Sequence, residues 1–281
     1  MTKEKLVLIG NGMSGIITIE ELLKLAPEQY DITVIGAEPH ANYNRIMLSP
    51  VLAGEKTIED IILNDLDWYK DNGITLKTGS PVTGIDRVAR RLVTEDGDEF
   101  EYNRLLMATG SNPFIIPVPG HDKEGVIGFR DIADVDAMLA TSKSYKKAVV
   151  IGGGLLGLEA ANGLMKNGME VTVVHLLDSL MERQLDKPAS ALLKASLEER
   201  GMTFLMEAQT SEITGIGRVQ GVKFSDGSEV ETDLVVMAVG IRPSMTLAEQ
   251  AGIHCERGVV VNDTMQTYDP SIYAVGECVQ H

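Results

Sequence analysis

The hydrophobic pattern of this chain shows one arrangement twice: an apolar run of strand length, a cluster of glycines, and a segment with helical spacing. The first run, residues 5–9, leads into Gly10-Asn11-Gly12-Met13-Ser14-Gly15 and a helical segment over about 13–26. The second run, Lys147–Ile151, leads into Gly152-Gly153-Gly154-Leu155-Leu156-Gly157 and a helical segment that ends near Gly168. A second apolar strand follows each helix, at 31–35 and at 170–174. The pattern predicts two βαβ units, one in each half of the chain.

The order of elements after each unit is also similar, which supports an internal repeat. In the first half we expect a capping box at Thr57, a helix capped by Asn64, hairpin strands at 91–94 and 99–102, and a buried strand at 104–110. In the second half we expect a lead-in helix capped by Asp131, a helix at 187–200, a hairpin around Asp226-Gly227, and a strand at 233–240.

The last part of the chain is too short to form a third domain. It contains a strand at 258–262 and an apolar segment at 271–277, followed by the expected start of a helix near Glu277. We interpret it as the return of the chain to the first domain, and we expect the chain to be a fragment that stops where this helix begins. The predicted fold is α/β, with two Rossmann-like domains of parallel strands and small antiparallel meanders. The predicted domains are 1–115 and 246–281 together, the first being discontinuous, and 116–245 between them.

Composition and charge narrow the range of functions. The chain has 281 residues, 44% of them hydrophobic and 23% charged, which is typical of a globular protein. It has no apolar run long enough for a membrane helix and no signal peptide, so we expect a cytoplasmic protein without membrane contact. A net charge of −16 argues against nucleic acid as a partner. The two cysteines form no closely spaced pair, so we expect neither a redox-active disulfide nor a metal site.

The glycine clusters are the strongest chemical signal. In a strand–G-x-G-x-x-G–helix motif, the first glycine permits a tight turn and the second lets the backbone approach a pyrophosphate. The third lets the helix pack closely on the strand, so that its N-terminal N–H groups face the phosphates. Two such motifs in matching context predict two dinucleotides on one chain, and therefore electron transfer between them.

The first domain and the returning segment supply the candidates for the first dinucleotide. Glu38, 23 residues beyond Gly15, is the candidate acid for ribose hydroxyls, although a loop carboxylate is the alternative. Arg45 is a candidate for pyrophosphate or for covering a ring, or a plain surface arginine. Thr109 with Gly110 suits close backbone approach, and Glu277 suits a hydroxyl contact or an ordinary helix cap. The full set of candidates is Gly10, Gly12, Met13, Ser14, Gly15, Glu38, Arg45, Val82, Ala108, Thr109, Gly110 and Glu277.

In the second domain the expected acid is missing. His175 occupies the end of the second strand, the next carboxylate is Asp178, and the closest arginine is Arg183, a pattern that favours NADH only slightly over NADPH. Glu159 is a candidate to face the nicotinamide or, alternatively, a partner of the helix dipole. The candidates here are Gly152, Gly154, Leu155, Leu156, Gly157, Glu159, His175 and Gly240.

With these motifs, the chain resembles the FAD-dependent pyridine nucleotide oxidoreductases over essentially its whole length. Further matching segments are 108–110, 238–243 and 273–277. The resemblance implies FAD in the first domain and NAD(P)H in the second. Glu277 departs from the aspartate that is usual in this family.

Two branches of the family are disfavoured. The helix at 13–26 lacks the cysteine pair of disulfide reductases, and Ser49 stands in the stretch where peroxidases and water-forming oxidases carry a reactive cysteine. Residues 175–186 and 276–281 resemble the assimilatory nitrite reductase large subunits. This resemblance implies hydride transfer from NAD(P)H to FAD and electron transfer onward to iron–sulfur and sirohaem centres beyond this chain.

Two alternatives remain open. The first is a reductase for rubredoxin or ferredoxin, and the second is a regulatory module that binds FAD or NADH without turnover. A homodimer is compatible with either. We assign no catalytic acid, base or nucleophile and no metal ligand within the chain.

Overall fold

A computed structural model describes residues 3–281, which divide into two compact units. Unit 1 contains the residues up to Asn44, then Ile62–Asn112 and Arg242–His281. Unit 2 contains Arg45–Ile61 and Pro113–Ile241. The segment 45–61 therefore belongs to unit 2, although the prediction includes it in the first domain. The changes of unit near 112 and 241 lie a few residues before the predicted boundaries at 115 and 245.

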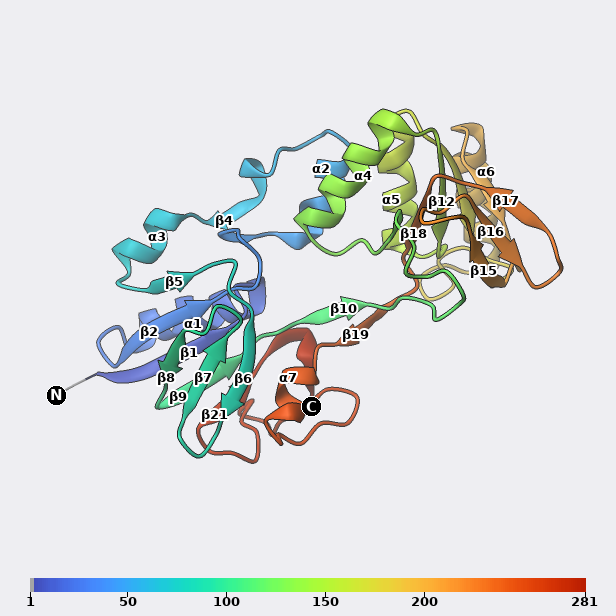
Figure 1. Cartoon of the computed structure of the whole chain (residues 1–281). Helices are drawn as coiled ribbons and strands as arrows, with labels where there is room; N and C mark the ends of the chain where they lie inside the picture. Colours follow the sequence, from blue (N-terminus) through green and yellow to red (C-terminus); the bar gives the residue numbers. More distant parts are fainter. Residues whose placement is uncertain (1–2) are drawn as a thin grey trace. The chain divides into compact units, whose positions relative to one another are not determined.

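Unit 1 is built on a five-stranded parallel sheet of order β21-β9-β1-β2-β5 (Figure 1). Side chains of β1 alternate between its two faces, because successive residues of a strand point to opposite sides. Leu6 and Leu8 pack in one core with helix α1, whereas Val7 and Ile9 pack in a second core with the small antiparallel sheet and the returning segment. The strands are β1 Glu4–Ile9, β2 Tyr30–Ile35, β5 Thr75–Lys77, β9 Arg104–Met107 and β21 Ile272–Ala274.

Short elements complete unit 1. Helix α1 buries Ile16 and Ile19 and ends before Ala26, with a proline next in the chain. The others are helices α3 Leu66–Asp71 and α7 Thr246–Gln250, the antiparallel sheet β6 Val82–Asp86, β7 Arg91–Thr94 and β8 Glu99–Glu101, the pair β3 Asn42–Tyr43 and β4 Ile62–Asn64, and the pair β20 Val259–Val260 and β22 Val279–Gln280; α1 itself spans Met13–Leu25.

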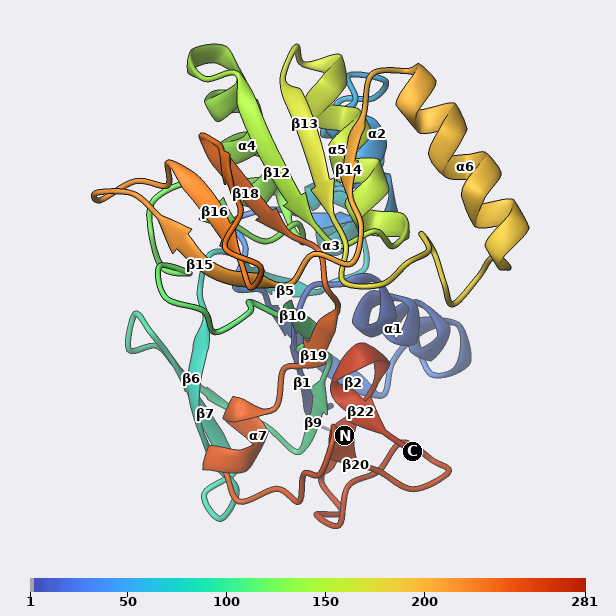
Figure 2. The same ribbon diagram turned by 90° about the vertical axis from the view of Figure 1, so that its right-hand side faces the viewer.

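Unit 2 repeats this plan with a parallel sheet of order β11-β18-β12-β13-β14, which faces the viewer in Figure 2. Helix α5 (Leu155–Lys166) packs against the strands β12 (Lys147–Ile151), β13 (Glu170–Val174) and β18 (Leu234–Met237). Its buried residues include Leu158, Ala161 and Leu164. A three-stranded antiparallel sheet supplies Ile213, Val222 and Phe224 to a core that it shares with the parallel strands.

The strands of the parallel sheet in unit 2 are β11 Val126–Ile127, β12 Lys147–Ile151, β13 Glu170–Val174, β14 Thr203–Leu205 and β18 Leu234–Met237. The antiparallel strands are β15 Thr210–Thr214, β16 Gly221–Phe224 and β17 Glu229–Glu231. The helices are α2 Leu48–Leu52, α4 Ile132–Ser144, α5 Leu155–Lys166 and α6 Lys187–Glu199. Strands β10 Ser111–Pro113 and β19 Ile241–Pro243 form a separate two-stranded sheet, and single 3-10 turns lie at Arg45–Met47, Glu59–Ile61 and Gly276–Cys278.

The predicted α/β fold and most predicted elements are confirmed, including the cap of α4, where the Asp131 carboxylate accepts a hydrogen bond from the N–H of Asp134. Three details are wrong. Asn64 ends β4 and donates to Glu20, while the next residue, Asp65, caps α3. Thr57 and Asp60 do exchange capping bonds, but they lead only into a 3-10 turn.

The third error concerns the end of the chain. The predicted helix near Glu277 is a 3-10 turn over Gly276–Cys278, followed by strand β22. Val279 pairs with Val259 of β20, so the backbone is extended here because a neighbouring strand takes up its hydrogen bonds. β20 itself is shorter than the predicted strand at 258–262.

Candidate functional site

The first glycine cluster, in unit 1, forms an open turn at the start of α1. Gly10 has φ +105°, and a Cβ there would lie 2.2 Å from the Ala108 carbonyl oxygen, so a side chain at this position would clash with the neighbouring strand. Gly15 is also tightly packed, with its Cβ position 3.0 Å from Ala108. Gly12 differs, because a Cβ there would meet no atom within 4 Å. Its side is open space.

No side chain caps α1, whose N-cap is Gly12 in extended conformation. The first N–H groups of a helix have no partner within the helix and carry a partial positive charge. The open side of Gly12 therefore lets an anion approach these N–H groups, and the geometry fits a pyrophosphate.

A hydrogen-bond network fixes this glycine turn to its surroundings. The Asn11 side chain donates to the His40 carbonyl at 3.2 Å and accepts from the Tyr69 hydroxyl at 2.7 Å. The Asn42 side chain donates to the Asn11 carbonyl at 2.9 Å. Tyr69 is 1% exposed, and this burial raises the pKa of its hydroxyl to about 12. Sequence reasoning missed Asn11 and Tyr69, since the motif allows any residue at the former position.

Glu38 and Glu277, the two predicted acids of unit 1, are both held by hydroxyl groups. The Tyr43 hydroxyl donates to Glu38 at 2.6 Å, and the Ser111 hydroxyl donates to Glu277 at 2.8 Å. Gly276, next to Glu277, has φ +81°, and a Cβ there would lie 2.8 Å from the Ser14 hydroxyl at the start of α1. The structure thus brings the returning segment to the first glycine turn.

The remaining candidates of unit 1 lie in different settings. The Thr109 hydroxyl donates to the Ser244 carbonyl at 2.9 Å, and Gly110 has φ +67°. Val82 begins β6 and packs at the edge of the core that contains Val7.

The second glycine cluster, in unit 2, has the same construction. Gly152 has φ +124° and a Cβ position 2.3 Å from the Ala238 carbonyl oxygen, while the Cβ position of Gly157 is 2.0 Å from the Gly152 carbonyl oxygen. Gly154, the N-cap of α5, again has open space on its side and no side-chain cap. This match at atomic detail makes Gly154 the counterpart of Gly12.

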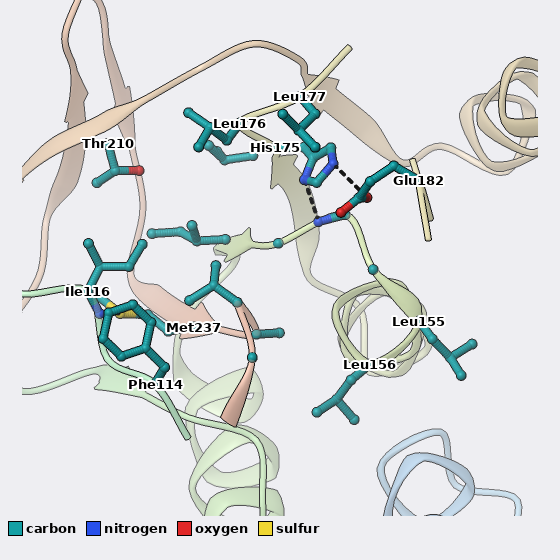
Figure 3. A pocket seen from close by; sticks show the side chains of 18 of the residues that line it. Phe114, Ile116, Leu155, Leu156, His175, Leu176, Leu177, Glu182, Thr210 and Met237 are labelled. Carbon is teal, nitrogen blue, oxygen red and sulfur yellow. Dashed lines mark hydrogen bonds and ion pairs between the residues drawn. The ribbon is translucent and has the colours of Figure 1, made fainter. Parts of the chain in front are cut away.

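A pocket of about 630 Å³ adjoins this second turn (Figure 3). Its size is ordinary for a small-molecule site. Two buried polar atoms at the pocket, His175 Nε2 and Thr210 Oγ1, have no hydrogen-bond partner among the described residues. Buried polar atoms are costly without a partner, so they fit a polar ligand. The apolar walls include Phe114, Ile116, Leu155, Leu156, Leu176, Leu177 and Met237.

His175 lies at the end of β13 and is 9% exposed. Its Nδ1 accepts a hydrogen bond from the N–H of Gly153 at 3.0 Å. Its Nε2 lies 3.3 Å from a carboxylate oxygen of Glu182, an ion-pair distance without the angles of a hydrogen bond. Sequence reasoning missed Glu182 and considered Asp178, which is outside the pocket lining and pairs with Lys187 at 2.5 Å. Glu182 lies in the loop between β13 and α6, and no local pattern in the sequence shows that this loop folds back on the glycine turn.

Glu159 and Arg45 both contact other parts of unit 2. Glu159, in α5, accepts a hydrogen bond from the Ser49 hydroxyl of α2 at 2.5 Å. Arg45 donates to the Arg130 carbonyl at 3.0 Å. Gly240 lines the pocket, and its carbonyl accepts from the N–H of Phe114 at 2.9 Å.

Comparison with known proteins identifies the family of this chain. The sequence pattern of the family described as pyridine nucleotide-disulphide oxidoreductase matches residues 4–281. The chain belongs to this family. The predicted family is therefore confirmed.

Two relatives of this chain from one organism are a nitrite reductase and an electron transfer subunit. Nitrite reductase (NAD(P)H) of Bacillus subtilis is 58% identical, over 100% of this chain and 35% of the relative. The assimilatory nitrate reductase electron transfer subunit of the same organism is 50% identical, over 100% of this chain and 36% of the relative. The chain thus spans about a third of the length of these relatives.

The fold of this chain is similar to that of solved structures. The covalent putidaredoxin reductase–putidaredoxin complex matches with a TM-score of 0.90 and 30% identity, over 99% of this chain and 68% of that chain. The resemblance to nitrite reductases is confirmed as a similarity in sequence, and putidaredoxin reductase shares the architecture of this chain.

Further features of the described residues concern disulfides, metal sites and membrane-spanning helices. Within residues 3–281 both cysteines, Cys255 and Cys278, are free thiols, and no group of three or more His, Cys, Asp or Glu side chains is arranged to hold a metal ion. In the same described range, no helix is both long and apolar enough to cross a membrane.

Proposed function

We propose that this chain binds FAD in unit 1 and a nicotinamide dinucleotide in unit 2, and that it passes electrons from the second to the first and onward to a metal centre. The observation that carries the proposal is the repeated glycine turn, in which Gly12 and Gly154 each leave open space beside an uncapped helix N-terminus. When bound, the two cofactors supply hydride transfer and then the release of single electrons. The chain supplies binding and orientation.

Several of the predicted residues have a proposed role in binding. In unit 1, Glu38 would accept hydrogen bonds from ribose hydroxyls, and Glu277 would do so from the hydroxyls of the flavin side chain, both held in place by the hydroxyl donors described above. In unit 2, the Leu155–Leu156 start of α5 would face the pyrophosphate, and the apolar pocket would take the adenosine half of the donor. Glu159 would lie near the nicotinamide, oriented by Ser49.

The relatives suggest where the electrons go. The proposed role is that of the N-terminal reductase part of an assimilatory nitrite reductase, with iron–sulfur and sirohaem centres outside this chain as acceptors. The support is the 58% sequence identity to the nitrite reductase of Bacillus subtilis. A reductase of an iron–sulfur carrier protein is the second candidate, supported by the match to the putidaredoxin reductase structure. The charge of −16 makes docking of an acidic carrier less favourable, so we prefer the first candidate.

NADH is the proposed donor. A cytoplasmic location and a homodimer stay predictions, the latter to be measured by analytical ultracentrifugation.

The experiment is an assay of NADH-driven ferricyanide reduction with added FAD. We expect turnover that depends on FAD, and we expect NADH to bleach the visible flavin absorption. A preparation that binds FAD but is not bleached by NADH would instead support the regulatory module. The rate with a soluble iron–sulfur carrier as acceptor would then be compared with the rate with ferricyanide. This comparison separates a reductase of a carrier protein from the reductase part of a nitrite reductase.

A further inference from the structure

We propose that Glu182 is the residue that selects the coenzyme in unit 2, by accepting hydrogen bonds from an unmodified ribose and repelling a 2′-phosphate. This inference rests on the proposed function, namely that the Gly152–Gly157 turn binds the nicotinamide dinucleotide. The usual acid at the end of the second strand is replaced by His175, and the structure supplies a carboxylate from a different part of the chain.

The position of Glu182 follows from the sheet. Strands β12 and β13 are parallel neighbours, so the glycine turn after β12 and His175 after β13 lie at the same edge. The N–H of Gly153 donates to His175 Nδ1 at 3.0 Å, which joins the two directly. A carboxylate oxygen of Glu182 lies 3.3 Å from the opposite nitrogen of the same ring. Figure 3 shows the two side chains pointing toward each other.

Backbone contacts hold the loop of Glu182 against the glycine turn. The N–H of Met181, the preceding residue, donates to the Gly153 carbonyl at 3.0 Å. A Cβ on Gly153 would lie 2.6 Å from Leu180 and 2.8 Å from the ring of His175, so only glycine allows this close packing. Leu180 is 0% exposed and anchors the loop. The carboxylate is therefore positioned by neighbours on both sides.

His175 and Glu182 together offer a hydrogen-bond donor and a hydrogen-bond acceptor, and a ribose diol can use both. A backbone N–H can only donate, so His175 Nδ1 must accept, and the proton of the neutral ring is on Nε2. Nε2–H is then a buried donor with no hydrogen-bond partner among the described residues, and Glu182 beside it is an acceptor with a third of its side chain exposed. A hydroxyl group can accept from the first and donate to the second.

A 2′-phosphate would meet the same carboxylate with a charge between about −1.5 and −2. At several ångströms and the intermediate dielectric of a partly exposed site, this repulsion is enough for at least about a tenfold loss of affinity. Arg183 also lines the pocket and is the cation that would oppose this effect. The proposal is that Glu182 outweighs it, because the loop of Glu182 is held against the glycine turn by the Met181–Gly153 hydrogen bond and by the packing of Leu180.

The test uses two probes without a nicotinamide ring, ADP-ribose and its 2′-phosphate, with binding measured by isothermal titration calorimetry on the 281-residue chain. We expect the chain to prefer ADP-ribose by at least about tenfold. Glu182→Gln should narrow this preference at least about fivefold, chiefly by tighter binding of the phosphorylated probe. Asp178→Asn is the matched control, since this carboxylate is in the same loop but outside the pocket lining, and it should change the ratio less than about twofold.

The possible outcomes distinguish failure of the inference about Glu182 from failure of the proposed function, which is dinucleotide binding in unit 2. If ADP-ribose binds but the unaltered chain shows no preference, or if Glu182→Gln leaves the ratio unchanged while its thermal unfolding is normal, the inference is overturned and the proposed function stands. If neither probe binds, both are overturned. As a second variant, Arg183→Gln should weaken binding of the phosphorylated probe only.

Discussion

At the scale of single residues, the glycines of the two turns divide into those required for packing and those that leave space. Gly10, Gly152 and Gly157 each have a Cβ position within 2.3 Å of a backbone carbonyl oxygen or closer, so they are required for the fold itself. Gly12 and Gly154 have no atom within 4 Å, so the fold alone gives no reason for glycine there. Ligand binding is therefore the simplest explanation for glycine at positions 12 and 154.

Gly153 and Gly154 test this distinction side by side. Gly153→Ala should destabilise the chain by about 1–3 kcal/mol, because the added methyl would overlap Leu180 and His175. Gly154→Ala should leave the free energy of unfolding within about 1 kcal/mol of the unaltered value, since its methyl enters open space. Urea unfolding followed by circular dichroism measures both. Equal losses would contradict the division of the glycines.

Tyr69 and Tyr102 form a second matched pair. The Tyr69 hydroxyl donates to Asn11, so Tyr69→Phe should cost about 1–2 kcal/mol and leave the Asn11 oxygen without its donor. The Tyr102 hydroxyl is buried with no hydrogen-bond partner among the described residues, so Tyr102→Phe should be close to neutral. Urea unfolding at neutral pH compares the two variants.

These tyrosines also predict how stability changes at alkaline pH. Burial raises the pKa of each to about 12, above the ordinary value of 10.0 that applies in the unfolded chain. The unfolded state therefore loses these protons first, and the contribution to stability that is complete below pH 10 is lost as the pH rises toward 12. Each Phe variant should show a smaller alkaline loss than the unaltered chain. An unchanged slope of unfolding free energy against pH between about 9 and 11 would contradict the assignment.

At the scale of elements, the least expected arrangement is the packing of α2 on α5. The segment 45–61 precedes unit 2 in sequence by some fifty residues, yet it belongs to that unit. Leu52 of α2 is 0% exposed and lies against Gly163 of α5, and Ser49 bonds to Glu159 one turn earlier on the same helix. The glycine in the middle of α5 is therefore a docking position for α2.

Gly163→Ala tests this docking. In an open helix, glycine to alanine stabilises by about 1 kcal/mol, because alanine has the better helix propensity. Here the added Cβ would lie 2.6 Å from Leu52, and overpacking costs about 1–3 kcal/mol. We expect net destabilisation, together with a weaker hold on Glu159 through displacement of Ser49. A more stable variant, measured by urea unfolding, would show that α2 adapts without cost.

At the scale of the whole molecule, the same construction occurs in two units that carry out different proposed tasks. Each unit has its own parallel sheet, its own cores and its own glycine turn. The two cofactor sites should therefore be separable by mutation.

Gly12→Val and Gly154→Val measure this separation. A valine side chain would fill the space that a pyrophosphate needs, so Gly12→Val should reduce FAD binding by at least about a hundredfold and leave ADP-ribose binding within about twofold. Gly154→Val should do the opposite. Calorimetry with each ligand gives the result, and loss of both ligands from one variant with normal unfolding would mean that the sites are wrongly assigned.

The two βαβ units, the parallel sheets and the family were predictable from the amino-acid sequence. These features depend on local rules: apolar runs of strand length, helical spacing and glycines at fixed offsets, all of which act over a few neighbouring residues. The cap of α4 by Asp131 was predictable for the same reason.

The contacts between residues far apart in the chain could be seen only in the tertiary structure. Glu182 reaches His175 because a loop turns back on Gly153, and α2 joins α5 because Leu52 fits the space beside Gly163. The end of the chain is extended because Val279 pairs with Val259, a partner that local pattern does not reveal. Pairings of this kind depend on shape and on hydrogen bonds between segments far apart in the chain, and a single sequence carries no local signal for them.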